Sequence, residues 1–312
     1  MAPDLQTVQR LVAALLNLAV AVLTGASVSR LWLGRDASAW AAARRQPVRT
    51  AAVAAAMVSL AASAAWLWLE SAAMAEVPVA DAGSAVWTML RSTHLGVAYC
   101  VGTAGLVVAA AGALVRGGAG RWPARLTLAA LAVFWYTRSM VSHAAGDGDF
   151  SVRLLADWVH LGLISLWVGE VFIAGAIVLK TSGNMAATDR RARSAYVESL
   201  SNSATVALSG IFVTGGYAAW RGIGGWDYLI GNPYANTLVA KVLVVGLAAA
   251  LGGFNRFVVM PAWRAHESTG HAVPHGLPAR FKRVLWIEAL LLLAAVVLAA
   301  WLASTPPPGE QM

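Results

Sequence analysis

Three histidines lie within or beside strongly apolar stretches of this 312-residue sequence: His94, His143 and His160. Met140 precedes His143 by one helical turn, so we predict that both side chains lie on one face of a helix. Imidazole and thioether groups together suit Cu(I) better than Mg²⁺ or Ca²⁺, which prefer oxygen ligands. The four residues therefore indicate a copper site. Each has a plainer alternative, because methionine fills cores and an intramembrane histidine can hydrogen-bond one helix to another.

Charged side chains in the same apolar stretches could support such a site. Asp157 lies one helical turn before His160 and could orient its imidazole or pair with Arg138. Lys241, in a later stretch, could join the same network. Glu170 lies deeper, and two roles stay open for it: a step on a cation path, or a protonated group bonded to a neighbour.

Further polar residues fall near the other side of the membrane. Glu288 and Arg256 are expected to pair at one depth for structural reasons. His266, His271 and His275 lie in a long charged loop before the last apolar stretch. Their spacing fits no strong metal signature, so a solvated loop is favoured over an inner acceptor site for metal.

The composition shows which elements must hold these side chains. The chain is 59% hydrophobic and 12% charged, far outside the usual range for soluble domains. A bilayer core of about 30 Å needs roughly 20 apolar residues per helical span. We therefore predict an all-α bundle of eight transmembrane helices in a single domain, residues 1–308, followed by a short disordered tail, residues 309–312. The spans are predicted near residues 8–33, 51–75, 85–115, 124–145, 152–179, 194–220, 235–261 and 283–304.

Charge predicts how the bundle is oriented. Most of the 23 Lys and Arg residues fall in alternate loops, which the positive-inside rule makes cytoplasmic. Both termini are then periplasmic. His94, expected well inside the third span, His143, at the outer end of the fourth, and His160, in the fifth, then share the outer half of the membrane. This topology accounts for the net charge of +8, so the expected surroundings are a lipid bilayer and no nucleic-acid partner is indicated.

The sequence resembles a known family, copper resistance protein D (CopD). The stretch "MVSHAAGDGDFSVRLLADWVHLGLISLWVGE", residues 140–170, resembles a family segment with a histidine, a loop and a helix bearing Asp and His. The later stretches "LSGIFVTGGYAAW", "NPYANTLVAKVLVVGLAAALGGFNRFVVMP" and "FKRVLWIEALLLLAAVVLAAWLASTPPP" are similar to family motifs in the same order. The resemblance is strongest over residues 135–308. It departs at Glu170, where the family's Trp-x-Gly-Gly turn has its second glycine.

The resemblance implies a bacterial inner-membrane protein of copper homeostasis that moves copper from periplasm to cytoplasm. Some relatives carry a fused extracellular copper-binding domain that this sequence does not show. The expected source of copper is therefore a separate periplasmic copper-binding protein of the CopC type, or the free ion. The residues at family motif positions are His143, Asp157, His160, Lys241, Asn255, Arg256 and Glu288.

These observations together predict a copper transporter, not an enzyme. We expect Cu(I) to bind at an outer site formed by His143 and His160, with His94 and Met140 as further ligands. Passage is expected without ATP, because the sequence has no phosphate-binding loop. Two alternatives stay open. A haem-binding membrane protein could use the transmembrane histidines as axial ligands for electron transfer or porphyrinogen oxidation, and a non-transporting accessory could hand copper to a membrane cuproenzyme.

Overall fold

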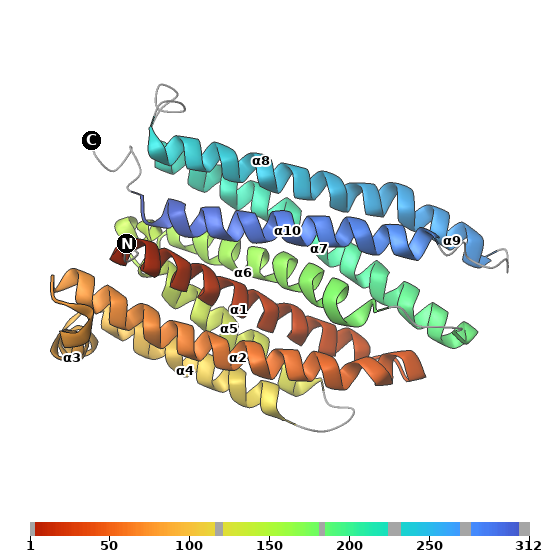
Figure 1. Cartoon of the computed structure of the whole chain (residues 1–312), viewed down its shortest axis with the longest axis horizontal. Coiled ribbons are helices and arrows are strands. Elements are labelled where there is room, and N and C mark those ends of the chain that lie inside the picture. The colour runs from red at the N-terminus through yellow and green to blue at the C-terminus, as the bar shows by residue number, and fades with distance from the viewer. Residues whose placement is uncertain (1–3, 116–120, 181–184, 224–231, 269–275, 306–312) are drawn as a thin grey trace.

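The computed structural model describes residues 4–115, 121–180, 185–223, 232–268 and 276–305. The regular elements within these ranges are all helices, and the long ones pack side by side in an elongated bundle (Figure 1). The predicted all-α class is therefore confirmed for the described chain.

The elements follow one another in a simple order. They are α1 (Leu5–Leu33), α2 (Ala39–Met74), η1 (Val79–Asp81), α3 (Gly83–Ser92), α4 (His94–Leu114), α5 (Trp122–Ser139), η2 (His143–Asp147), α6 (Val152–Ile173), η3 (Ala174–Val178), α7 (Ala187–Ile223), α8 (Pro233–Phe254), η5 (Asn255–Val259), α9 (Met260–Ser268) and α10 (Gly276–Ala303). Two of the short elements, η3 and η5, are π-helical turns that continue α6 and α8.

Among the described residues, six helical stretches are long and apolar enough to cross a membrane. They are Leu5–Leu33, Ala39–Met74, His94–Leu114, Val152–Val178, Pro233–Ala265 and Gly276–Ala303. The chain is therefore a multi-pass membrane protein. Two more of the predicted spans contain α5 and α7, which run along the bundle but fall outside this set of six. The count of eight crossings thus stays a prediction.

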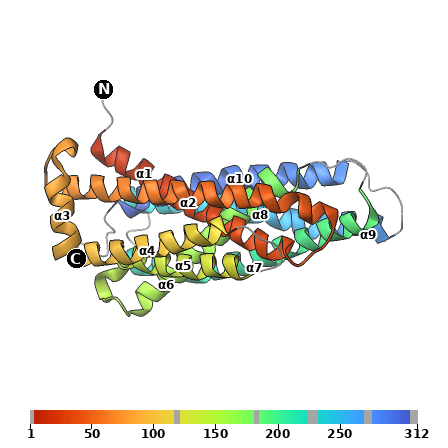
Figure 2. The same ribbon diagram turned by 90° about the horizontal axis from the view of Figure 1, so that it is seen from below.

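The third predicted span, residues 85–115, is not one helix. α3 ends at Ser92, and Thr93 adopts an extended backbone whose side-chain oxygen accepts a hydrogen bond from Gly96 N at 3.0 Å. This N-cap starts a new helix, α4, at His94. α3 lies across the end of the bundle (Figure 2). The prediction of one continuous span was wrong because a single capping residue redirects an otherwise apolar chain.

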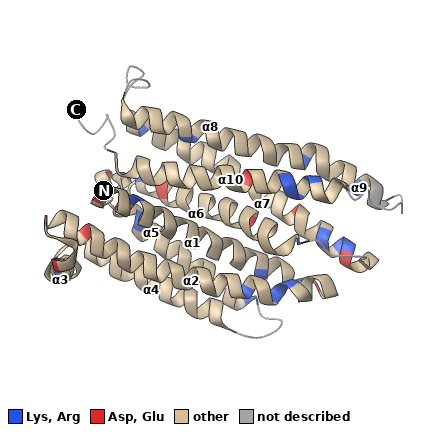
Figure 3. Ribbon diagram, in the orientation of Figure 1, with Lys and Arg blue, Asp and Glu red and all other residues tan. Residues whose placement is uncertain are grey.

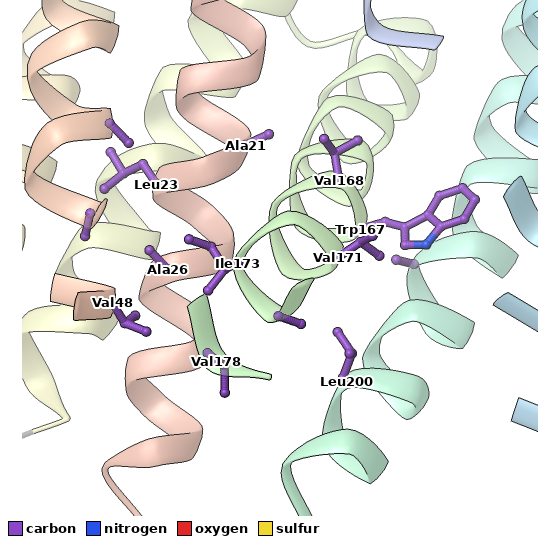
Figure 4. Packing of buried hydrophobic residues seen from close by; sticks show 14 of the residues in the cluster. Ala21, Leu23, Ala26, Val48, Trp167, Val168, Val171, Ile173, Val178 and Leu200 are labelled. Atoms are coloured by element: carbon purple, nitrogen blue, oxygen red, sulfur yellow. The ribbon is translucent and has the colours of Figure 1, made fainter. Parts of the chain in front are cut away.

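Helices α1 and α6 meet backbone to backbone at the centre of the bundle. A Cβ atom on Gly25 would overlap the carbonyl group of Gly169, and one on Gly169 would overlap the carbonyl group of Ala21. Glycine at both positions therefore permits the crossing. Buried side chains surround it, including Leu23 of α1 and Ile173 of α6 (Figure 4).

The two ends of the bundle differ in charge. Most Lys and Arg side chains lie toward one end of the bundle, the end at which α2, α7 and α10 begin (Figure 3). We call it the basic end. The opposite end, which we call the histidine end, holds the start of α1 and the end of α10, where Arg10 Nε donates to Ser304 Oγ at 2.7 Å. Both ends of the described chain therefore lie at the histidine end. That this end is periplasmic remains a prediction of the positive-inside rule.

Replacing Gly169 with alanine should destabilise the bundle, because the added Cβ would collide with the Ala21 carbonyl group. Overpacking a close interface costs about 1–3 kcal/mol. The matched control is Gly246→Ala, since a Cβ on Gly246 of α8 meets no heavy atom within 4 Å. The midpoint of thermal unfolding in detergent, followed by circular dichroism, should fall for the first variant only. Equal midpoints would contradict the backbone contact.

Candidate functional site

The ring of His160 lies against α7, and its hydrogen bonds define its chemistry. Nδ1 lies 2.9 Å from Thr214 Oγ1, while the Thr214 hydroxyl donates its own proton to the Gly210 carbonyl oxygen at 2.7 Å. A hydroxyl has one proton, so the hydrogen-bond pattern assigns Nδ1–H as the donor to Thr214 and leaves the lone pair on Nε2. Gly215 permits the close approach, because a Cβ there would lie 3.0 Å from ring atom Cε1. In its neutral form His160 can therefore bind a metal through Nε2.

His143 lies at the histidine end, in the short turn η2 between α5 and α6. Its side chain is exposed, and its Nε2 lies 3.2 Å from the carbonyl oxygen of Ala303 at the end of α10. The hydroxyl of the preceding residue, Ser142, is shared between two acceptors, Asp157 Oδ2 at 3.1 Å and the Ser139 carbonyl oxygen at 3.0 Å. Because Asp157 is one turn before His160 on α6, this bond ties the segment that carries His143 to the helix that carries His160.

The expectation that Met140 and His143 share one helical face was wrong. α5 ends at Ser139, Met140 is the residue that caps it, and η2 begins at His143. The helical periodicity that would align the two side chains therefore does not continue between them. Met140 is half-buried near the histidine end, so it stays a candidate ligand by position alone.

His94 is also placed differently from the prediction. It is the first residue of α4, not a residue deep within a span, and its side chain is 53% exposed. Its Nε2 lies 2.8 Å from Asp149 Oδ2, and Tyr136 Oη donates to the Asp149 carbonyl oxygen at 2.6 Å. A carboxylate partner of this kind orients metal-binding histidines in many sites. Here it also joins α4 to the loop before α6.

A group of charged side chains lies beside His160. The Arg138 guanidinium stacks 4.5 Å from the centre of the Trp66 ring and is within electrostatic range of Glu70 and Asp157. Lys241 of α8 is also within range of Asp157. Charges of opposite sign are thus distributed over α2, α5, α6 and α8. In an apolar membrane such charges are stable only when they compensate one another, which gives Asp157 a supporting role between two cations.

Glu170 lies further along α6, nearer the basic end, and is completely buried. Ser203 Oγ of α7 donates to its Oε1 at 2.7 Å. Its second oxygen, Oε2, is buried with no hydrogen-bond partner among the described residues. Glu170 therefore accepts one hydrogen bond across the contact between α6 and α7, and its second carboxyl oxygen stays unused. Both predicted roles of Glu170 stay predictions.

Metal-binding geometry is limited in the described part of the chain. No group of three or more His, Cys, Asp or Glu side chains there could hold a metal ion. A site formed by His143, His160 and Met140 needs only two residues of that kind, with a thioether as a soft third donor for Cu(I). The second histidine group lies outside the described residues: His271 and His275 entirely, and His266 in its side chain.

Thr214, which bonds to the His160 ring, was not among the site residues predicted from the sequence. The signal was present in the stretch "VTGG", residues 213–216, where a hydroxyl residue precedes two glycines. Glycine opens the helix face that receives the ring, and threonine supplies the hydrogen bond. Only the packing of α6 on α7 shows that these residues meet His160.

Two protein families match the chain. One, described as Copper resistance protein D, matches residues 194–302. The other, described as Copper resistance protein D-like, N-terminal domain, matches residues 4–152. No curated protein and no solved structure matches the chain. The residues between the two matched ranges include Asp157, His160 and Glu170, whereas Thr214, which bonds to His160, lies within the first of these ranges, residues 194–302.

Changing Asp157 to asparagine should destabilise the protein, because Arg138 and Lys241 would lose a compensating charge in apolar surroundings. Removing one partner of a buried charge pair costs about 3–5 kcal/mol, and we expect the lower part of that range for this half-buried carboxylate. The midpoint of thermal unfolding in detergent would measure the effect.

Two further variants control this experiment. Asp149→Asn removes a carboxylate that contacts only the exposed His94 ring, so its effect should be smaller. Adding Lys241→Met to Asp157→Asn should recover part of the lost stability, because the uncompensated cation is then absent. A double variant no more stable than Asp157→Asn alone would show that the two charges do not interact.

Proposed function

Because the chain belongs to the copper resistance protein D family, we propose that it carries copper as Cu(I) from periplasm to cytoplasm across the bacterial inner membrane. The observation that best supports a metal-handling role is the hydrogen bond between His160 Nδ1 and Thr214 Oγ1. Thr214 fixes Nδ1 of the ring and leaves Nε2 able to bind a metal. Copper in this proposal is the transported substrate.

The proposed outer site is formed by His143 and His160, with Met140 as a further ligand, and it leaves out His94, which pairs with Asp149. The Ser142–Asp157 bond supports this site, because it joins the segments that carry the two principal histidines. Imidazole and thioether donors select Cu(I) over hard cations. Asp157, Arg138 and Lys241 lie around the site, and Glu170 is the next ionisable group along α6 on the proposed path inward.

The source and the driving force follow from the same proposal. Copper reaches the histidine end from a separate periplasmic protein of the CopC type or as the free ion. The sequence has no phosphate-binding loop, so passage follows a gradient and does not use ATP. In this proposal the protein performs no catalysis.

Purified protein should bind nearly stoichiometric Cu(I) under anaerobic conditions, and His143→Ala/His160→Ala should lose it, because both imidazole donors are gone. Copper per chain, measured by atomic spectrometry after desalting, tests this. The matched control is His266→Ala, which removes a histidine on α9 at the basic end and should leave binding unchanged. Equal copper in the wild type and the double variant would contradict the site. A Soret band in the purified wild type would instead indicate haem.

Whole-cell measurements then separate transport from delivery. Expression of the wild type should raise cytoplasmic copper, whereas His143→Ala/His160→Ala should not, at equal amounts of protein in the membrane. Copper binding without any rise in cytoplasmic copper would contradict transport and favour an accessory that hands copper to a membrane cuproenzyme.

Thr214→Val should weaken Cu(I) binding about 10–100-fold, the usual effect of removing a group that orients a metal-binding histidine. Valine keeps the shape of threonine but cannot accept the hydrogen bond from Nδ1. Thr214→Ser retains the hydroxyl and should bind nearly as tightly as the wild type. The dissociation constant is measured by competition with a colorimetric Cu(I) chelator. Equal affinities for the Val and Ser variants would show that the hydrogen bond does not support ligation.

A further inference from the structure

A cavity of about 210 Å³ lies apart from the proposed copper site, among α6, α7, α8 with its continuation η5, and α10. None of the candidate copper ligands lines it. Its walls are mainly apolar and include Leu200, Phe257, Phe281 and Leu285. Ligand sites in helix bundles combine such walls with a few polar groups that point inward, so the polar groups of this cavity decide what it could bind.

Two residues that line the cavity carry hydrogen-bond acceptors. Glu288 of α10 is 3% exposed, and its Oε1 accepts a hydrogen bond from Trp167 Nε1 at 2.9 Å. Asn255 donates from Nδ2 to the Phe281 carbonyl oxygen at 3.2 Å, and its Oδ1 is buried with no partner among the described residues. Because a carboxyl group has two oxygens that accept hydrogen bonds, Glu288 is the acceptor that remains for a ligand.

The π-helical turn η5 places a cation beside these acceptors. Asn255 and Arg256 are consecutive residues, and both line the cavity. Arg256 Nη1 donates to Ser201 Oγ at 2.7 Å and to Asn202 Oδ1 at 3.1 Å. A guanidinium has five N–H donors, more than these two bonds use. The prediction that Arg256 pairs with Glu288 was wrong, because each side chain bonds to other residues. The cavity therefore offers a ligand both an acceptor and a donor.

The cavity reaches the protein surface at α7 and η5. Its lining residues Thr205 of α7 and Phe257 of η5 are exposed, and Phe257 is 74% exposed. Only 6% of the apolar window within Pro233–Ala265, the stretch that contains α8, is buried inside the protein. The surface around this opening therefore faces hydrocarbon, and a ligand would enter from the lipid phase.

We propose that this cavity binds a membrane-soluble quinol, with its ring between the apolar walls and its tail passing between α7 and α8 into the lipid. One hydroxyl group donates to Glu288, and the other oxygen accepts from Arg256. A phospholipid phosphate fits less well, because it would meet the carboxyl group of Glu288. A plain acyl chain would make no hydrogen bond to Glu288 or Arg256. The proposal concerns binding alone and does not depend on copper transport.

Isothermal titration calorimetry of the detergent-purified full chain with a short-tailed quinol tests this proposal. We expect saturable binding, and binding at least about tenfold weaker for the dimethyl ether of the same quinol, which lacks both hydroxyl donors. Ala204→Phe, which adds a ring to the cavity wall, should also weaken binding at least about tenfold. Ala218→Phe adds the same ring at an exposed position of α7 outside the cavity and should bind like the wild type.

The outcomes separate the possibilities. Equal affinity for the quinol and its dimethyl ether would overturn the proposal, because the polar groups would then play no part. Normal binding by Ala204→Phe would place the ligand elsewhere and overturn it too. Displacement of the quinol by phospholipid alone would assign the cavity to bilayer lipid. The ether comparison uses wild-type protein, so it decides the question even if Ala204→Phe does not fold. Unchanged quinol binding by His143→Ala/His160→Ala would distinguish this site from the copper site.

Discussion

The backbone contact between Gly25 of α1 and Gly169 of α6 is the constraint on which the rest of the structure depends. Helices in a membrane gain little from hydrophobic attraction to one another, so close packing and interhelical hydrogen bonds must hold them. The contact positions α6 at the centre of the bundle. α6 in turn carries Asp157, His160, Trp167 and Glu170, and bonds from three of these side chains fix its orientation toward α7 and α10.

These polar side chains of α6 bond to three other segments. Asp157 accepts a hydrogen bond from Ser142. His160 bonds to Thr214 and Glu170 to Ser203, both of α7, and Trp167 donates to Glu288 of α10. A polar group in hydrocarbon is costly unless it is paired. The pairs therefore stabilise the bundle and at the same time select the orientation of each functional group. The proposed copper site and the cavity proposed to bind a quinol lie at different depths but share this helix.

The two predictions about local helix structure that were wrong, the continuous third span and the shared face of Met140 and His143, have local causes. Thr93 caps α4 and brings His94 to the bundle end, although the surrounding residues are apolar enough for one long span. α5 ends at Ser139, so Met140 and His143 do not lie on one continuous helix and their spacing does not align their side chains. Hydrophobicity over twenty residues predicts a crossing but does not show a single capping residue that interrupts it.

The sequence by itself determined that the chain is a multi-pass helical membrane protein with its cations concentrated at one end. It did so because the transfer of a segment into lipid depends on composition and length, which are properties of the sequence alone. It also carried the resemblance to the copper resistance family. Only the tertiary structure decided which nitrogen of His160 bonds to Thr214, and that Glu288 and Asn255 line a common cavity. These features depend on which helices pack together, and residues distant in the sequence supply every partner.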